Sequence, residues 1–449
     1  MTDEDVRAGF LAGAERIDVT VAGRDPGRWP GYTPRTAVTA YRLPRAVAAV
    51  WDFSVYGGSF SEDDATVLAA AAAAAVDARL PLVTWVRSGG TRLQEGVAAL
   101  VGIPRARIAL HRLAAAGLAH LSVADAPTTG GVWISVVAAA DLRVAVEGAT
   151  VAFAGPRVVE AFTGSLPSPG SHTAGSAYAA GLVDALLPAG GISSWIDRVL
   201  TALTPAAQPA PAVSAAQVPA VTGREQVARS RARAVGGREL LSSLLPDLVE
   251  LRGADGTVFA ALGRLGGRPV VGVAVGAEVG GRPTPAGYRL AARAYRLADR
   301  LRVPVLSLVD TPGADPGTAS EQGGIAPAMG DALDALLLCG SPTVALVHGE
   351  GGSGGALAAA ATDVVVVTAE SYFAAIGPEG AAAALRRPAD ECADLMRITP
   401  ADLLALGLAD AVGTAADLAA HLDALTGMSA AERLVRRQER WGSPVPGRL

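Results

Sequence analysis

The sequence predicts an α/β protein of two domains, and three observations support this class. The chain has 449 residues, which is long for one hydrophobic core and sufficient for two domains of roughly 200 residues each. Continuous apolar runs alternate with alanine-rich segments, as expected of strands in sheets that helices cover on both faces. Several short motifs also occur twice along the chain, in the same order.

Four apolar runs in each half are the predicted strands, or edges of strands. They lie at 45–56, 79–86, 120–126 and 132–140 in the first half, and at 268–276, 302–310, 342–349 and 362–370 in the second. The alanine-rich run at 68–80 is interrupted by Asp and Arg, so it predicts a buried helix rather than a membrane span.

The boundary between the domains is predicted at 204–222, a segment rich in Pro and Ala, nearly uncharged and without helical periodicity. This composition is typical of a semi-rigid linker. The prediction is therefore an N-terminal domain at 1–203, a linker at 204–222 and a C-terminal domain at 223–449. The C-terminal domain begins with basic helical sequence at 223–238.

Four pairs of motifs relate the two halves to each other. Residues 83–92 correspond to 306–315, 126–135 to 349–358, 151–162 to 371–385, and 179–187 to 404–412. Self-similarity in a fixed order indicates an internal repeat. The sequence therefore predicts that one domain has been duplicated.

The composition excludes several kinds of site and partner. The chain has no lysine, so its 38 basic residues are all arginine; a P-loop lysine, a Schiff-base lysine and a biotinylated lysine on this chain are excluded. Cys339 and Cys392 lack metal-ligand spacing, so no zinc site is expected. The net charge of −5 does not indicate a nucleic-acid partner. With no secretory or membrane-spanning segment predicted, we expect a cytoplasmic protein.

The glycine-rich stretch at 349–357, "GEGGSGGAL", follows a predicted strand and is the first candidate for a functional loop. As a phosphate-binding loop it would need the lysine that the chain lacks. The sequence "VDTPG" at 309–313 matches the Asp-x-x-Gly switch of GTPases over only a few residues, so a GTPase has little support.

A nucleophilic serine is the second interpretation of this stretch. Gly351-x-Ser353-x-Gly355 fits the elbow of α/β-hydrolases, in which an acid and a histidine follow the serine along the chain. The only later histidine is His421, within an amphipathic helical segment, while His348 precedes the serine. The motif therefore lacks its partners.

Backbone chemistry is the third interpretation. Glycines let N–H groups approach a ligand closely, and the start of a helix adds positive potential. Donors of this kind stabilise developing negative charge in acyl and enolate chemistry. A second loop, "TTGG" at 128–131, lies in register one domain earlier. The alternative is that these glycines only permit tight turns, but their ordered repetition favours two oxyanion holes.

These motifs resemble the carboxyltransferase subunits of bacterial acetyl-CoA carboxylase, over most of 45–190 and 235–415. The first half is similar to the beta subunit through "SGGTRLQEG" (88–96), "APTTGGVWIS" (126–135) and "FAGPRVVEA" (153–161). The second half is similar to the alpha subunit through residues 283–317, "VHGEGGSGGALA" (347–358) and "SYFAAIGPEGAAAAL" (371–385). The resemblance implies an α/β fold of two crotonase-type (ClpP/crotonase) domains, each a spiral of ββα units.

The resemblance also implies a reaction and a set of site residues. Carboxyltransferases of this family move CO2 from carboxybiotin to the α-carbon of an acyl-CoA through an enolate. Gly130 and Gly131 are expected to stabilise the thioester oxygen, and Gly355 and Ala356 the biotin oxygen. The other expected residues are Ser88, Gly89, Gly90, Arg92, Gly155 and Arg157 on the CoA side, and Gly313, Gly352, Gly354, Gly377, Glu379 and Gly380 on the biotin side. No metal ligand is expected.

The partners implied by the resemblance are an acyl-CoA such as acetyl- or propionyl-CoA, a biotin carrier protein and a biotin carboxylase, each separate from this chain. A homodimer or homohexamer with active sites at its interface is implied as well. The chain departs from the family in lacking the zinc ribbon of the beta subunit and in carrying Arg87 where relatives commonly have Asp.

Two other functions remain open at the level of the sequence. One is a decarboxylase of malonyl-CoA or malonyl-carrier protein, using the same site without biotin. The other is a non-catalytic scaffold in a biosynthetic complex.

Overall fold

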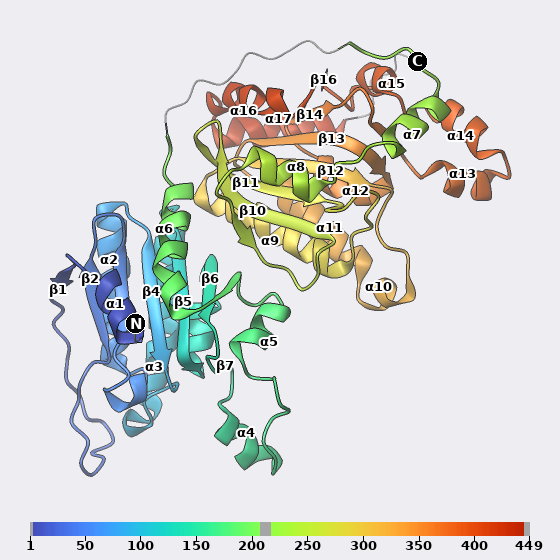
Figure 1. Cartoon of the computed structure of the whole chain (residues 1–449). Coiled ribbons are helices and arrows are strands. Elements are labelled where there is room, and N and C mark those ends of the chain that lie inside the picture. Colours follow the sequence, from blue (N-terminus) through green and yellow to red (C-terminus); the bar gives the residue numbers. More distant parts are fainter. Residues whose placement is uncertain (1–2, 207–216, 444–449) are drawn as a thin grey trace. The chain divides into compact units, whose positions relative to one another are not determined.

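The computed structural model describes residues 3–206 and 217–443, and the chain divides into two compact units, Met1–Leu200 and Thr201–Leu449. Each unit is an α/β domain built on one eight-stranded sheet (Figure 1). Helix α6 ends at Ala202 and helix α7 begins at Gly223. The predicted linker includes residues 207–216, which lie outside the described residues, so its boundaries and character stay a prediction.

The elements of the first unit follow one another along the chain as three short antiparallel strands and then parallel strands with intervening helices. They are α1 (Asp3–Phe10), β1 (Glu15–Ile17), β2 (Val38–Arg42), β3 (Val47–Trp51), η1 (Tyr56–Gly58), α2 (Glu62–Ala78), β4 (Leu82–Ser88), η2 (Leu93–Glu95), α3 (Val97–Ala115), β5 (His120–Thr129), η3 (Trp133–Val137), β6 (Leu142–Val146), β7 (Val151–Ala152), α4 (Pro156–Thr163), α5 (Ala174–Ala179), β8 (Ala185–Leu187), η4 (Ala189–Gly191) and α6 (Ile192–Ala202).

The second unit repeats this plan. Its elements are α7 (Gly223–Arg231), α8 (Gly237–Leu244), β9 (Val249–Leu251), β10 (Val258–Leu265), β11 (Arg268–Val275), α9 (Pro285–Leu301), β12 (Val305–Thr311), α10 (Thr318–Gln322), α11 (Ile325–Leu337), β13 (Thr343–Gly352), α12 (Ser353–Ala360), β14 (Val364–Val367), β15 (Tyr372–Ala374), α13 (Pro378–Leu385), α14 (Ala389–Leu395), α15 (Pro400–Ala405), β16 (Ala411–Val412), η5 (Ala415–Asp417), α16 (Leu418–Thr426) and α17 (Ala430–Gly442).

The two sheets have the same topology, which confirms the predicted duplication. The strand orders are β1-β2-β3-β4-β5-β6-β8 and β9-β10-β11-β12-β13-β14-β16. In each sheet one ten-residue strand pairs with two successive strands on one side: β5 with β6 and then β7, and β13 with β14 and then β15. The far end of each long strand thus has a different neighbour on that side, within the same sheet. Both glycine loops lie at this end.

Side chains repeat along with the strands. The carboxylate of Asp141 accepts a hydrogen bond from the His120 amide at 2.7 Å, and that of Asp363 accepts one from the Thr343 amide at 2.8 Å. In both units an aspartate before the next parallel strand therefore satisfies an amide at the start of the long strand.

The core of the second unit is divided between the two faces of its sheet. Leu306 and Leu308 of β12 pack in one apolar cluster with residues of α8 and α16. Ser307, between them, points to the other face and lies 3.3 Å from the hydroxyl of Tyr295 on α9. Because side chains alternate along a strand, α8 and α9 cover opposite faces (Figure 1).

The prediction of a strand at 132–140 is wrong; the other seven predicted strands are present. Residues Trp133–Val137 form a short π-helix directly after β5. The run of β-branched side chains favours a strand locally, but Gly130 has φ +69° and turns the chain away from the strand direction. Val136 and Val137 are buried within that turn. Their apolar character therefore reflects burial in a helical turn rather than in a strand.

One helical prediction also needed adjustment. The run at 68–80 is helical as expected, within α2, but the basic segment at 223–238 forms parts of two helices, α7 and α8, with a break between them. The segment with His421 forms α16, and a further helix, α17, follows it.

Candidate active site

The first glycine loop lies where β5 ends, against the loop that follows β4. Gly130 has φ +69° and Gly90 has φ +116°, conformations that favour glycine. A Cβ atom on Gly130 would lie 3.0 Å from the Cα of Gly90. The hydroxyl of Ser88 accepts a hydrogen bond from the Gly90 amide at 3.1 Å. Of the residues expected on the CoA side, Ser88 and Gly90 are therefore brought together with Gly130 and Gly131.

The N–H groups of this loop differ in availability. The Gly130 amide donates to the carbonyl oxygen of Phe153 at 2.9 Å, so a role for it in the reaction requires that bond to open. Gly131 begins the helical turn, where amides have no acceptor within the helix. Gly131 is thus the better donor of the predicted pair, and Val132 is the next one along the turn.

The second glycine loop has the same backbone plan. Gly313 has φ +130°, and its amide donates to the Thr311 hydroxyl at 3.2 Å, as Gly90 does to Ser88. Ser353 has φ +60° and occupies the position that Gly130 has in the first loop. A Cβ atom on Gly355 would lie 2.6 Å from the Ala314 amide nitrogen. The loops after β12 and β13 are therefore in contact.

The helix start in this loop has a single side chain, that of Ser353. Gly352 is the N-cap of α12, and Gly354 is exposed. The four amides from the N-cap onward have no acceptor within a helix, and these belong to 352–355. The Ala356 amide is the first that has one, the Gly352 carbonyl. Position in the helix thus favours Gly354 and Gly355 as donors over the predicted pair of Gly355 and Ala356.

Ser353 lacks the partners of a nucleophile. Among the described residues, no histidine hydrogen-bonds to its hydroxyl. The pKa of His348, five residues earlier, is lowered to about 4 by burial and then by the charge of Arg233. The hydrolase interpretation of this loop has no support in the structure.

A network of charged side chains lies behind the second loop. Arg233 ion-pairs with the buried Asp310 through two nitrogens, one of them at 2.7 Å. The Asp310 carboxylate also accepts a hydrogen bond from the Glu350 amide at 3.1 Å. Arg231 bridges Glu350, at 3.2 Å, and Glu379, at 2.6 Å. Through these bonds α7 and the start of α13 are held against the end of β13.

The network sets the protonation of its members. The hydrogen bond from Arg231 lowers the pKa of Glu379 and raises that of Arg231 itself. Burial raises the pKa of Tyr372, and its hydrogen bond to Glu350, at 2.6 Å, adds to the effect. Glu379 is therefore ionised and paired, in the first turn of α13.

Sequence reasoning identified Glu379 but missed Asp310, Glu350, Arg231 and Arg233. The available signal was a single acidic residue inside or directly after an apolar strand, at 310 and at 350. Because buried carboxylates need partners, such a residue indicates a basic partner elsewhere in the chain. The pairing itself joins residues 77 to 148 positions apart, which no local pattern encodes.

The remaining predicted residues have different positions. Arg92 is fully buried and ion-pairs with Asp64 at 3.1 Å, so its guanidinium group is held within the unit, behind the loop. Gly155 is the N-cap of α4 and Gly377 that of α13. These two glycines therefore have equivalent positions in the two units. The exposed Arg157 has the same place in α4 that Glu379 has in α13. Gly89 donates to Gly57 at 2.9 Å, and Gly380 packs on Ile376.

Within residues 3–206 and 217–443, no group of three or more His, Cys, Asp or Glu side chains is arranged to hold a metal ion. No helix in the same residues combines the length and the apolar character needed to cross a bilayer.

Comparison with known sequences identifies the relatives of this chain. A family model described as acetyl co-enzyme A carboxylase carboxyltransferase-like matches residues 219–441. A fused beta/alpha carboxyl transferase of acetyl-coenzyme A carboxylase from Salinispora tropica is 37% identical, over 87% of this chain and 75% of its own length. A probable biotin-dependent acyl-coenzyme A carboxylase beta3 subunit from Mycobacterium tuberculosis is 34% identical, over 88% of this chain and 86% of its own length.

Comparison with solved structures concerns the fold. The transcarboxylase 12S, a hexamer crystallised with hydrolysed methylmalonyl-coenzyme A, matches 95% of this chain and 90% of its own, with a TM-score of 0.78 at 22% identity. A single-chain long-chain acyl-CoA carboxylase matches 87% of this chain and 41% of its own, with a TM-score of 0.69 at 20% identity. The expected two-domain, crotonase-like α/β fold is confirmed by these neighbours and by the two repeated sheets.

Proposed function

This chain belongs to the carboxyltransferase family of acetyl-CoA carboxylases, and we propose that it is the carboxyltransferase component of a biotin-dependent acyl-CoA carboxylase. In this proposal it transfers a carboxyl group to the α-carbon of a short acyl-CoA, acetyl- or propionyl-CoA. The observation that carries it is the pair of accessible helix starts, one per unit, each following a strand and a left-handed turn.

The second loop fits the urea-type carbonyl of biotin. The helix start is bare, because Gly354 is exposed and a Cβ there would meet only Met329, at 3.7 Å. Biotin, on its separate carrier, supplies the carboxyl group and accepts the α-proton of the thioester. The amides of Gly354 and Gly355 would hold its carbonyl oxygen as negative charge develops. Glu379, ionised and tied to Arg231, would fix the neighbouring helix start.

The first loop is assigned to the acyl thioester. The amide of Gly131 at the start of the turn would donate to the thioester oxygen as it becomes an enolate oxygen, and this stabilisation lowers the barrier to forming the new carbon–carbon bond. A Cβ atom on Gly131 would lie 2.8 Å from Ile103 and 3.0 Å from the Thr91 hydroxyl. Glycine there keeps the backbone close to its neighbours and to the substrate.

A second copy of the chain is proposed as a partner. Helix α3, which carries Ile103 beside the first loop, exposes the apolar stripe Val97, Leu100, Val101 and Ile108, with Val97 77% exposed. Apolar patches of this kind next to a functional loop mark protein contacts. We propose a homodimer or homohexamer in which the first loop of one copy works with the second loop of another.

Carboxyl transfer is tested directly. The purified chain is incubated with a biotinylated carrier protein and malonyl- or methylmalonyl-CoA, and carboxyl exchange between carrier and acyl-CoA is measured. We expect exchange that depends on biotin. Turnover that is absent with every acyl-CoA would contradict the proposal, and CO2 release from malonyl-CoA without biotin would favour the decarboxylase instead.

Mixing two inactive variants tests the shared site. Gly131→Val blocks the first loop and Gly355→Val the second. If each site uses loops of two copies, co-refolded or co-expressed mixtures contain some sites with two intact loops, and up to about a quarter of the activity returns on statistical pairing. If each copy carried its own complete site, the mixture would stay inactive.

A further inference from the structure

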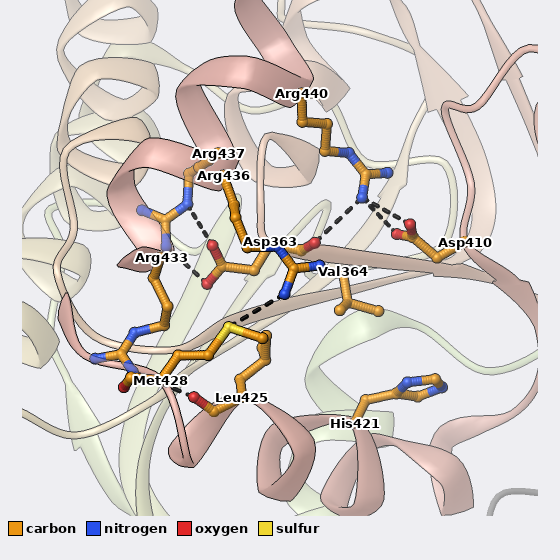
Figure 2. Close-up of a pocket in the computed structure, with 10 residues that line it drawn as sticks. All are labelled: Asp363, Val364, Asp410, His421, Leu425, Met428, Arg433, Arg436, Arg437 and Arg440. Carbon is orange, nitrogen blue, oxygen red and sulfur yellow. Dashed lines mark hydrogen bonds and ion pairs between the residues drawn. The ribbon is translucent and has the colours of Figure 1, made fainter. Parts of the chain in front are cut away.

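A pocket of about 340 Å³ lies in the second unit, between α17, α16 and the starts of β14 and β16 (Figure 2). The strands β12, β13, β14 and β16 are parallel. Their amino ends therefore lie at one end of the sheet and their carboxyl ends at the other. The second glycine loop follows the carboxyl end of β13, so this pocket is separate from the candidate active site.

The pocket has an excess of positive charge. Four arginines and two aspartates line it, which leaves two positive charges when all are ionised. The arginines, shown in Figure 2, all come from α17; they are Arg433, Arg436, Arg437 and Arg440. An uncompensated excess of guanidinium groups around a cavity attracts small anions.

Two of the arginines attach α17 to the rest of the unit. Arg437 is fully buried and ion-pairs with Asp363 at 2.7 Å. Arg433 donates to the carbonyl oxygens of Gly340, at 2.8 Å, and of Leu425, at 3.2 Å. The donors of these two side chains are occupied by the protein, so they form the wall of the pocket rather than its binding groups.

The other polar groups have donors to spare. In the part of the chain that the structure describes, no carboxylate pairs with Arg436, whose hydrogen bond goes to the sulfur of Met428 at 3.2 Å, a weak acceptor. Arg440 pairs with Asp410 at 2.6 Å, and its terminal nitrogens also donate to the carbonyl oxygens of Asp363 and Leu408. Its Nε is the donor left over, buried without a partner. The Nε2 of His421 is likewise buried without one. Buried polar groups without partners are costly and normally satisfied.

We propose that this pocket binds a phosphate-bearing small molecule through Arg436, Arg440 and His421. Guanidinium groups match the geometry of phosphate oxygens and bind them through paired hydrogen bonds. A phosphate group carries about −1.5 to −2 charges near neutral pH, which balances the two charges in excess. The pocket is also within the usual size range for small ligands. The ligand reaches the unit at the end of the sheet remote from the glycine loop.

Calorimetric titration of the full chain with pyrophosphate, and separately with ADP, tests the site at constant ionic strength. We expect saturable binding to one site per chain, which Arg436→Gln weakens about tenfold or more because a charge-assisted hydrogen bond is lost. Arg112→Gln, an exposed arginine at the end of α3 in the other unit, is the matched control and should leave the affinity unchanged. Tighter binding of ADP than of pyrophosphate would identify a nucleotide as the source of the phosphate.

Two outcomes would overturn the proposal. One is a lack of saturable binding for both probes at millimolar concentration. The other is equal binding by the parent chain and by Arg436→Gln, with Arg436→Glu as a second variant that should repel the anion. Gly355→Val separates this site from the catalytic one, because it should lose carboxyl transfer and keep the affinity for pyrophosphate. If instead Gly355→Val lost that affinity, the two sites would not be independent.

Discussion

The loop after β5 and the loop after β13 share a backbone and differ in almost every surrounding side chain. Both have a glycine with strongly positive φ after the preceding strand, at Gly90 and Gly313, and a left-handed residue before the helix start. Asp310, fully buried and paired with Arg233, occupies the place that Arg87 has in the first unit. Arg87 instead donates to the Ala126 carbonyl and lies over the ring of Phe53.

This difference separates the backbone features that both loops share from the side chains that each loop has alone. The turn and the helix start are common to both units, and in the proposed mechanism they would hold the two oxyanions. The charged side chains around them differ, and in the same proposal they would distinguish one bound group from the other. The second loop is held by the ion pairs of Arg231 and Arg233. The first has one buried ion pair, between Arg92 and Asp64, and borders apolar side chains such as Ile103 and the exposed stripe of α3.

The largest expected effect comes from filling either helix start. Gly355→Val places side-chain atoms against the Ala314 amide and the Tyr288 hydroxyl, with the Cβ alone 2.6 and 2.7 Å from them. Because backbone at that distance cannot move aside easily, we expect carboxyl transfer to fall at least 100-fold, as for loss of an oxyanion donor. Steady-state exchange assays measure it.

The same change in the first loop sharpens the comparison. Gly131→Val meets the end of the Ile103 side chain, which can rotate, so its fold should survive while transfer is still lost. Gly427→Val, at a position with open space around it, is the control and should keep full activity. Normal activity in both loop variants would exclude backbone oxyanion holes.

The sequence was informative about these loops and uninformative about their surroundings, for a physical reason. Glycine repeats and apolar runs are local patterns, so seven of the eight strands predicted from the sequence are present, and the repetition of the two glycine loops could be expected. The strand predicted at 132–140 failed because a left-handed turn outside the run decided its direction. The pairing of Arg233 with Asp310 depends on how α7, which Arg233 follows, packs against β13 next to β12, and only the folded unit contains that information.

Removal of a buried charge partner should test the second loop's network. Arg233→Gln leaves Asp310 uncompensated in a buried position, so we expect the free energy of unfolding of the second unit to fall by about 3–5 kcal/mol. Arg87→Gln, at the position of the first unit that corresponds to Asp310, removes a partly exposed group without a buried carboxylate and should cost about 1 kcal/mol or less. Denaturant unfolding, monitored separately for the two units, measures both. Equal effects would mean that the two loops do not differ in this respect.

The pH dependence of stability should also differ between the units. His348 has a pKa of about 4 in the folded state, against 6.5 for a free histidine, so the unfolded chain binds the extra proton first as pH falls. The contribution of neutral His348 to the free energy of unfolding of the second unit is complete above pH 6.5. It is lost progressively toward pH 4, by about 2 kcal/mol between pH 7 and pH 5. The first unit has Asp125 at this position, bonded to Trp85 at 3.0 Å.

His348→Asn measures this contribution. It should remove that part of the pH dependence from the second unit's unfolding, while His111→Asn, an exposed histidine of the first unit, should not. An unchanged pH profile in His348→Asn would show that His348 does not titrate in this range on unfolding.

The smallest expected effect concerns the one non-glycine residue in a left-handed turn at the loops. Ser353 has φ +60°, which costs an L-residue about 1–2 kcal/mol, and glycine would relieve that strain at an entropic cost of about 0.5–1 kcal/mol. Ser353→Gly should therefore change stability by about 1 kcal/mol or less, and Ser353→Ala should keep carboxyl transfer within about threefold. Gly130→Ser, the reverse change in the first loop, would bring a Cβ to 3.0 Å from Gly90 and should cost more. If Ser353→Ala abolished transfer, the hydroxyl would be catalytic, and the equivalence of the two loops would be lost.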